Sequence, residues 1–183
     1  MQICGIDPGL RSTGWGIIRL DGNRLIWIAD GMIRPDPDMT MPERLNHIRT
    51  GLADVISTYQ PDRAAIEDIF VAKNAASALK LGMARGVAIV TLADAGLSVD
   101  EISARRVKQN ITGSGRADKN QVSAMVSRLL NITPSGADAA DALAVAISAS
   151  NETTLTANDD QASVTDRLDH AISAALARQG GQS

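Results

Sequence analysis

A chain of 183 residues, 44% of them hydrophobic, has room for one domain with a substantial buried core and no room for a second catalytic domain. The net charge of −3 and the sequence pI of about 5.3 argue against a generic nucleic-acid-binding domain, because such domains are usually basic. The single Cys4 excludes a disulfide framework, and the first residues lack a basic leader followed by an apolar run, so we expect a soluble, cytoplasmic protein.

The charge is unevenly distributed along the chain. Residues 1–150 hold 16 Lys and Arg against 16 Asp and Glu, whereas residues 151–183 hold 2 against 5. Between Lys73 and Arg128 there are 9 basic and 4 acidic residues. A neutral domain with such a basic belt can bind phosphates although the whole chain is acidic.

Short apolar runs bounded by turn residues predict three strands at 2–7, 14–20 and 24–33, the last two joined by a hairpin turn at 21–23. A Pro-rich loop at 34–44 precedes a pattern of helical spacing from Leu45 to Tyr59. A fourth strand is predicted in residues 63–70, ending near Glu67.

Residues 74–95 are rich in Ala and Gly and predict a helix, and residues 99–103 predict a short fifth strand. Three further helices are predicted at 104–111, from about 118 to 130, and from the break at 133–136 to about 150. The order predicts an α/β domain with a mixed five-stranded sheet flanked by helices, over residues 1–150. Residues 151–183 predict an acidic linker and a possible amphipathic helix carrying Val164, Leu168, Ile172 and Leu176, or a disordered tail.

Two carboxylates follow apolar strand patterns. Asp7 ends the first strand before Pro8 and Gly9, where it could project from the carboxyl edge of the sheet or simply begin a turn. Glu67 closes the run of residues 63–67, where a carboxylate would be desolvated unless a cation meets it; alternatively, the strand ends at Ile66 and Glu67 is in solvent.

Two more carboxylates, Asp138 and Asp141, begin a helix whose continuation carries no charge. Their spacing of three residues puts both on one face of that helix. A capping box formed with Ser135 would explain Asp138 but would leave Asp141 without a partner. Because four carboxylates at strand ends and a helix start, with no His or Cys beside them, suit Mg²⁺ or Mn²⁺, we expect a joint site for two divalent cations that catalyses phosphodiester cleavage.

Four long segments, GIDPGLRSTGWGII, AIEDIFVAKNAASALKLGMARGVAI, RRVKQNITGSGRADKNQV and ADAADALAVAI, resemble the bacterial Holliday-junction resolvases of the RuvC type in order and spacing. The resemblance covers about residues 1–150. It implies a ribonuclease-H-like fold and a homodimer that makes paired, metal-dependent nicks in four-way DNA junctions, leaving 5′-phosphate and 3′-hydroxyl ends, in recombination and repair. It also implies a branch-migration complex as partner.

In that family the residues matching Asp7, Glu67, Asp138 and Asp141 are catalytic and hold two Mg²⁺ ions. The first would bridge both ions, and some relatives carry His at the position of Asp138. The resemblance places the family's loop aromatic on Phe70 and its DNA-contacting lysines on Lys108 and Lys119.

The DNA-binding prediction extends to the residues around these positions. Phe70 precedes the polar Lys73 and could stack on a base, although a core ring is the ordinary explanation for an isolated aromatic. The basic run from Arg105 to Lys119, with Arg116 beside a Gly-rich bend, could contact phosphates or form a solvated helix face. The predicted DNA-binding residues are Phe70, Lys73, Arg105, Lys108, Arg116 and Lys119.

Small residues in the helix at 74–95 permit close packing, either on the chain's own sheet or against a second copy. Asp68 adds negative charge near the expected path of the phosphate. Two alternatives to a junction resolvase are a related ribonuclease-H-fold nuclease acting on RNA and a junction-binding protein without catalysis. We do not expect an actin-like ATPase fold, because its second phosphate loop and second domain do not fit in 183 residues.

Overall fold

The computed structural model describes residues 1–68 and 75–151. The chain divides into two units, Met1–Ser150 and Asn151–Ser183, and the first of these is described here. The possible amphipathic helix of the tail lies outside the described residues.

The elements of the first unit are β1 (Gln2–Asp7), β2 (Thr13–Asp21), β3 (Arg24–Ile33), α1 (Met41–Tyr59), β4 (Arg63–Asp68), α2 (Ala75–Asp94), β5 (Val99–Ser103), α3 (Ala104–Thr112) and α4 (Lys119–Leu130). A last core helix follows at residues 137–151. The strands form a five-stranded sheet with the order β3-β2-β1-β4-β5. β1 pairs antiparallel with β2, and β2 with β3, whereas β1 pairs parallel with β4, and β4 with β5. The predicted mixed sheet and the predicted order of elements are therefore confirmed.

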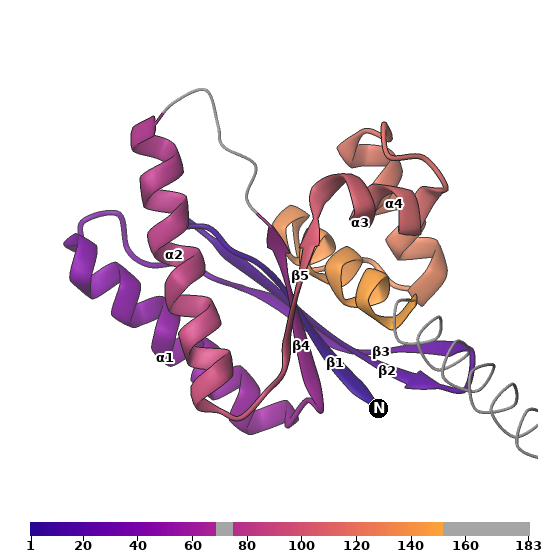
Figure 1. The fold of residues 1–183 in the computed structure, drawn as a ribbon, viewed down its shortest axis with the longest axis horizontal. Coiled ribbons are helices and arrows are strands. Elements are labelled where there is room, and N and C mark those ends of the chain that lie inside the picture. The colour runs from indigo at the N-terminus through magenta and orange to yellow at the C-terminus, as the bar shows by residue number, and fades with distance from the viewer. Residues whose placement is uncertain (69–74, 152–183) are drawn as a thin grey trace, which may run out of the picture. The chain divides into compact units, whose positions relative to one another are not determined.

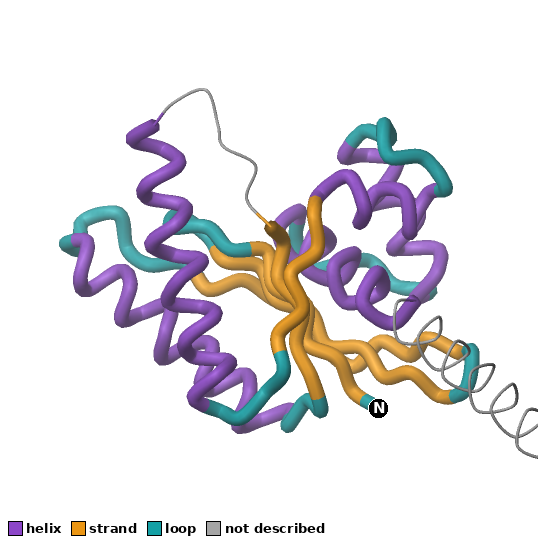
Figure 2. Tube along the Cα trace, viewed as in Figure 1, coloured by secondary structure: helices purple, strands orange, loops and turns teal. Residues whose placement is uncertain are grey.

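The helices form one layer on each face of the sheet (Figure 1). α1 and α2 cover one face, and α3, α4 and the last core helix cover the other. Figure 2 shows the strands as a twisted layer between these two groups of helices.

Each central strand contributes alternate side chains to two hydrophobic cores. In β1, Ile3 faces the core under the last core helix, whereas Cys4 and Ile6 face the core under α1 and α2. β4 alternates in the same way, with Ala65 on the first face and Ile66 on the second. The alternation continues to the strand ends, so the carboxyl edge of the sheet can present acidic side chains to opposite faces.

The last core helix lies directly against the backbone of β1 and β2. A Cβ atom added at Gly5 would lie 2.1 Å from the carbonyl oxygen of Ala142, and one added at Gly14 would lie 2.0 Å from the carbonyl oxygen of Asp138. From residue 142 to residue 150 every residue of this helix is buried. Backbone contact through glycine, combined with apolar burial, therefore determines where the helix begins above the sheet.

The start of α1 shows the largest difference between a predicted and an observed element boundary. α1 begins at Met41 rather than Leu45, so the end of the expected Pro-rich loop is already helical. The carboxylate of Glu43 accepts a hydrogen bond from the Thr40 N–H at 2.7 Å, and Pro42 occupies the first turn. A capping box and an N-terminal Pro are favourable helix starts, and here they outweigh the lack of apolar periodicity.

By length and composition alone α2 could cross a membrane. It carries Lys80 and Arg85, however, and its buried residues Ala84, Ala88 and Leu92 belong to the core between the sheet and α1. One side of α2 is therefore buried in the core, and its exposed outer side is apolar as well.

We expect Gly14→Ala to destabilise the fold, because its Cβ would overlap the Asp138 carbonyl and push the last core helix off the sheet. The expected loss is about 1–3 kcal/mol in the free energy of unfolding, measured by urea denaturation. Ser57→Ala, at an exposed position of α1, is the control, since it adds no atom at a packed position. Equal stability of the two variants would contradict the proposed role of the backbone contact.

Candidate functional site

Three of the four predicted carboxylates meet at the carboxyl end of β1. Asp7 is the last residue of β1, and Asp138 and Asp141 lie in the first turns of the last core helix. One carboxylate oxygen from each lies within 4.8 Å of the other two, and all three side chains are half-buried. Asp7 therefore belongs to a strand and to a cluster, and the alternative of a simple turn residue is wrong.

Glu67 stands beside this cluster in the neighbouring strand. The pairing of Ile6 with Ile66 puts Asp7 and Glu67 next to each other at the ends of parallel strands. β4 continues to Asp68, so Glu67 is a half-buried strand residue, and the alternative that it lies in solvent beyond the strand is wrong. The charge of Glu67 raises the pKa of Asp7, and the charge of Asp141 raises the pKa of Glu67.

The capping explanation for Asp138 does not hold. Ser135 precedes the last core helix, and its hydroxyl donates to the Asp30 carbonyl at 3.1 Å and also contacts the Asp30 carboxylate. The backbone N–H of Ser135 donates to the same carboxylate at 2.7 Å. Ser135 thus attaches the start of the helix to β3, and Asp138 is left to the carboxylate cluster.

The cluster is electrostatically strained. Burial, together with the charges of Glu67, Asp141 and Asp138, raises the pKa of Asp7 to about 7. Burial and the charge of Asp141 also raise the pKa of Glu67 above its usual range, while Lys108 and Lys119 partly oppose this shift. Like charges held together in a half-buried site favour either a proton or a cation between them.

The four carboxylates form a donor set suited to hard divalent cations. All their ligand atoms would be carboxylate oxygens, and no His or Cys belongs to the cluster within the described residues. Mg²⁺ and Mn²⁺ prefer such oxygen ligands, whereas Zn²⁺ favours nitrogen and sulfur. The residues present therefore fit the expected metal.

Two predicted DNA-contacting lysines lie against the acidic cluster. Lys119, the first residue of α4, places its Nζ 2.6 Å from Oδ2 of Asp141. This hydrogen bond, supported by the nearby carboxylates, raises the pKa of Lys119 above its usual range. Lys108 of α3 lines a pocket of about 250 Å³ together with Glu67, Lys119 and Asp141. α3 and α4 thus bring positive charge to one side of the carboxylates.

The other predicted DNA contacts are placed differently. Arg105 and Arg116 are exposed, and Arg116 lines a separate concavity of about 490 Å³ together with Arg128. Phe70 and Lys73 lie outside the described residues. The predicted DNA contacts therefore do not line one pocket, although the four that the structure describes all belong to the segment that runs from α3 to the start of α4.

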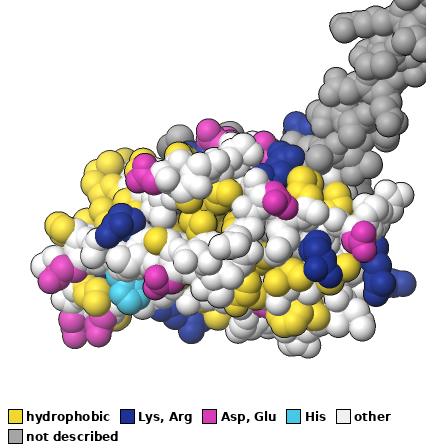
Figure 3. Space-filling view, turned by 90° about the horizontal axis from the view of Figure 1, so that it is seen from below, with side chains coloured by type: hydrophobic (Ala, Val, Ile, Leu, Met, Phe, Trp, Pro, Cys, Tyr) yellow, Lys and Arg dark blue, Asp and Glu magenta, His cyan; other side chains and the backbone are white. Residues whose placement is uncertain are grey.

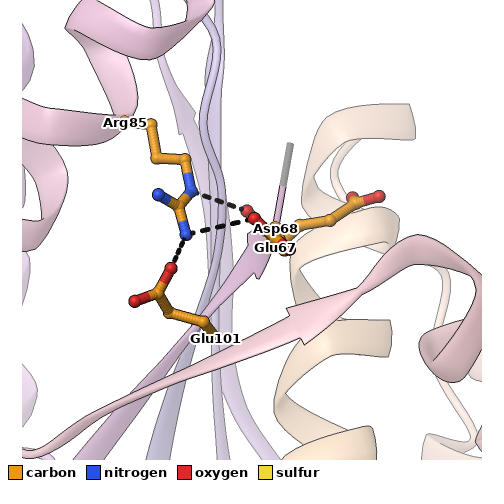
Figure 4. Close-up of polar contacts among 4 residues, drawn as sticks. All are labelled: Glu67, Asp68, Arg85 and Glu101. Carbon is orange, nitrogen blue, oxygen red and sulfur yellow. Dashed lines mark hydrogen bonds and ion pairs between the residues drawn. The ribbon is translucent and has the colours of Figure 1, made fainter. Parts of the chain in front are cut away.

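Arg85 joins α2 to the ends of β4 and β5 (Figure 4). Its Nε donates to the backbone carbonyl of Glu67 at 3.2 Å, and its Nη2 lies 3.6 Å from Oδ1 of Asp68 and contacts the carboxylate of Glu101. The Glu67 side chain extends away from Arg85, toward the last core helix. Arg85 thus fixes the Glu67 backbone from the face opposite its carboxylate.

This arrangement corrects the expectation for Asp68. Its carboxylate was expected near the incoming phosphate, but it is paired with Arg85 on the α2 side of the sheet. The reason is the alternation of the strand, which turns successive side chains to opposite faces. Asp68 therefore does not add its charge to the carboxylate cluster.

Sequence reasoning missed the functional potential of Arg85 and of a second group of cations, Arg11, Arg44 and Lys80, which come from three separate elements. An isolated Arg in an apolar, small-residue helix was the available signal for Arg85. Positive charge is otherwise dispersed on the face shown in Figure 3, where Lys and Arg side chains stand apart with Asp and Glu among them.

The raised pKa of Asp7 predicts how stability depends on pH without divalent cations. Between its unfolded pKa near 3.8 and its folded value of about 7, the folded state holds a proton that the unfolded state has lost. This contribution is complete below pH 4 and is lost as the pH rises through 7. In EDTA, Asp7→Asn should therefore raise Tm relative to wild type, by an amount that grows from pH 5 to pH 8.

Differential scanning fluorimetry across this range measures the effect. Asp54→Asn, at an exposed position of α1, is the charge-matched control and should show no such trend. A Tm difference for Asp7→Asn that does not change with pH would contradict a strained carboxylate at this position.

Comparison with known proteins agrees with the geometry. The family profile described as "Crossover junction endodeoxyribonuclease RuvC" matches residues 3–149. The chain is 54% identical over 148 residues to the crossover junction endodeoxyribonuclease RuvC of Zymomonas mobilis, which covers 80% of this chain and 89% of the relative.

Solved structures give the same result. The Thermus thermophilus RuvC structure superposes with a TM-score of 0.78 at 28% identity, covering 85% of this chain and 97% of that one. T. thermophilus RuvC in complex with a Holliday junction substrate gives a TM-score of 0.76 at 30% identity, covering 81% and 92%. Since the family profile spans most of the chain and the relative is more than half identical, this chain belongs to the RuvC family of crossover junction endodeoxyribonucleases.

Proposed function

We propose that this protein resolves four-way DNA junctions by paired nicks that leave 5′-phosphate and 3′-hydroxyl ends, in recombination and repair in the cytoplasm. The observation that carries the proposal is the cluster of Asp7, Asp138 and Asp141 within 4.8 Å, in a chain that belongs to this nuclease family. The family's structure with a Holliday junction substrate supports the choice of DNA substrate.

Asp7, Glu67, Asp138 and Asp141 would hold two Mg²⁺ ions, for which Mn²⁺ could substitute. Two bound cations would stabilise the attacking and leaving oxygens of an in-line displacement at phosphorus. The protein's own contribution is to hold the four carboxylates against their mutual repulsion. It does so through the packing of the last core helix on β1 and β2 and through the hold of Arg85 on the Glu67 backbone.

Lys108 and Lys119 would bind the DNA backbone next to the carboxylates. Both line the pocket that contains Glu67 and Asp141, so a phosphate that approaches the acidic residues meets positive charge at the same point. Arg105 and Arg116 would contact phosphates further away on the same segment. Phe70 as a stacking residue and Lys73 as a DNA contact stay predictions from the sequence, as does a branch-migration complex as partner.

The outer side of α2 supports the proposal of a homodimer. Leu79 and Val90 are 62% and 57% exposed, and Met83 lies between them on the same side of the helix. Gly82 and Gly86 share this side, and a Cβ at either would meet nothing within 4 Å. An apolar strip with glycines suits close packing against a second copy, and a two-fold dimer would bring two active sites to a junction.

Cleavage of a synthetic four-way junction tests the function. In Mg²⁺ the wild-type protein should introduce two nicks at symmetric positions, which a ligase can seal, and it should cut neither linear duplex nor an RNA–DNA hybrid comparably. Asp7→Asn should keep junction affinity and lose cleavage by roughly 100-fold or more, as expected when charge stabilisation of the transition state is removed.

Asp54→Asn again provides the control and should cleave normally. Cleavage by Asp7→Asn at the wild-type rate, or wild-type cleavage in EDTA, would refute the metal-dependent mechanism. Preferential cleavage of the hybrid would favour an RNA-directed nuclease, and junction binding without cleavage in either cation would favour a binding protein.

The oligomeric state tests the dimer. Val90→Glu should shift the protein from dimer to monomer in sedimentation velocity at micromolar concentration, because burial of a charge in an apolar interface is costly. Leu129→Glu is the matched control, since Leu129 is a 43% exposed leucine on α4. A wild-type protein that sediments as a monomer, or equal behaviour of both variants, would exclude α2 as the interface.

A further inference from the structure

A concavity of about 640 Å³ lies beside the carboxylate cluster. Its walls are the β1–β2 loop, the start of α1 and the first half of α2. Asp138, which belongs to the carboxylate cluster, also lines this concavity, so the two are contiguous. We call it the loop pocket. It differs from the pocket of Lys108 and Lys119, which is built by α3, α4 and the last core helix.

The loop pocket has an excess of positive charge. Arg11 from the β1–β2 loop, Arg44 from α1 and Lys80 from α2 line it, against the single carboxylate of Asp138. Within residues 1–68 and 75–151, neither Arg11 nor Lys80 forms an ion pair. Three cations that converge on one concavity against a single carboxylate favour an anionic ligand.

The floor of the loop pocket is formed before any ligand binds. Nη2 of Arg44 donates to the Leu10 carbonyl at 2.8 Å, and the Thr13 hydroxyl donates to the Gly9 carbonyl at 2.8 Å. A Cβ at Gly9 would lie 2.3 Å from the Ser12 carbonyl oxygen, so the tight turn requires glycine. A loop held in this way loses little conformational freedom when a ligand binds.

Two polar atoms at this floor are buried without a hydrogen-bond partner, Oγ of Ser12 and Nε of Arg44. Unsatisfied buried donors are uncommon in proteins, and they occur at binding sites. Both belong to residues that line the loop pocket.

We propose that the loop pocket binds a backbone phosphate of the DNA strand that is cut, next to the scissile phosphate. The proposal rests on the proposed function and adds a second phosphate contact from the α1 and α2 layer to the contacts of Lys108 and Lys119 from the α3 and α4 layer. Arg11 and Lys80 contact the phosphate oxygens, while Arg44 holds the loop. A strand bound on both sides of the carboxylates has its scissile phosphate fixed between two anchors.

The test combines side-chain and phosphate substitutions. Junction affinity is measured by fluorescence anisotropy in EDTA, where the strand stays uncut. Each junction carries one neutral methylphosphonate, placed in turn at each of the three phosphates on either side of the cleavage site. Wild type should lose affinity several-fold at one flanking phosphate. Lys80→Ala should bind the unmodified junction more weakly and lose its sensitivity at that phosphate alone, with a log-log salt slope smaller by about 0.9.

Arg11→Ala should lose sensitivity at the same phosphate, whereas Lys108→Ala should lose it at a different one. Arg24→Ala is the control, because Arg24 is an exposed arginine beside the β2–β3 turn at the other end of the sheet. Lys80 is exposed, so its replacement should leave Tm unchanged, which circular dichroism verifies.

If Lys80→Ala and Arg11→Ala both keep the wild-type sensitivity at every phosphate, the proposal is overturned. Junction cleavage by wild type would in that case still support the proposed function. A flat scan combined with inorganic phosphate binding that requires Lys80 would also overturn it, in favour of a free anion as the ligand. If wild type neither prefers nor cleaves junctions, the proposed function fails, and the same scan on linear duplex still tests the pocket.

Discussion

The contact between the last core helix and the glycines of β1 and β2 is the constraint on which the rest of the site depends. Without side chains at Gly5 and Gly14, the helix backbone reaches the strand backbone, and burial of residues 142–150 holds it there. Because Asp138 and Asp141 begin this helix, apolar packing forces them against Asp7 at the strand end. The free energy of apolar burial thus holds the carboxylates together against their electrostatic repulsion.

The charges around this contact are divided by the sheet. On one face the carboxylates repel one another, and Lys108 and Lys119 reduce the repulsion. On the other face Arg85 neutralises Asp68 and Glu101, which would otherwise add to the negative charge at the same edge. A polyanionic substrate could therefore approach an acidic centre in an acidic protein, because positive charge lies beside the centre and surplus acid is paired elsewhere.

The fold and the carboxylates could be predicted from the sequence because their signals are local. Apolar runs of period two and patterns of period 3.6 identify strands and helices, and Asp7 and Glu67 stand out because they end such runs. Strand alternation places the Asp68 side chain on the face opposite to Glu67, but this could be predicted only if β4 was known to continue past Glu67. The loop pocket could not be predicted, because Arg11, Arg44 and Lys80 are far apart in the chain and only the tertiary fold brings them together.

α2 has three roles, each on a different side of the helix. Lys80 lines the loop pocket, Arg85 reaches β4 and β5, and Val90 lies on the exposed apolar side. Successive helical residues are about 100° apart, so one inserted residue between Lys80 and Arg85 would rotate everything that follows relative to everything before it. A single substitution on α2 can therefore affect one role at a time, whereas a change in the length of α2 would misalign all three. An insertion at the open turn around Gly22 would have no such effect.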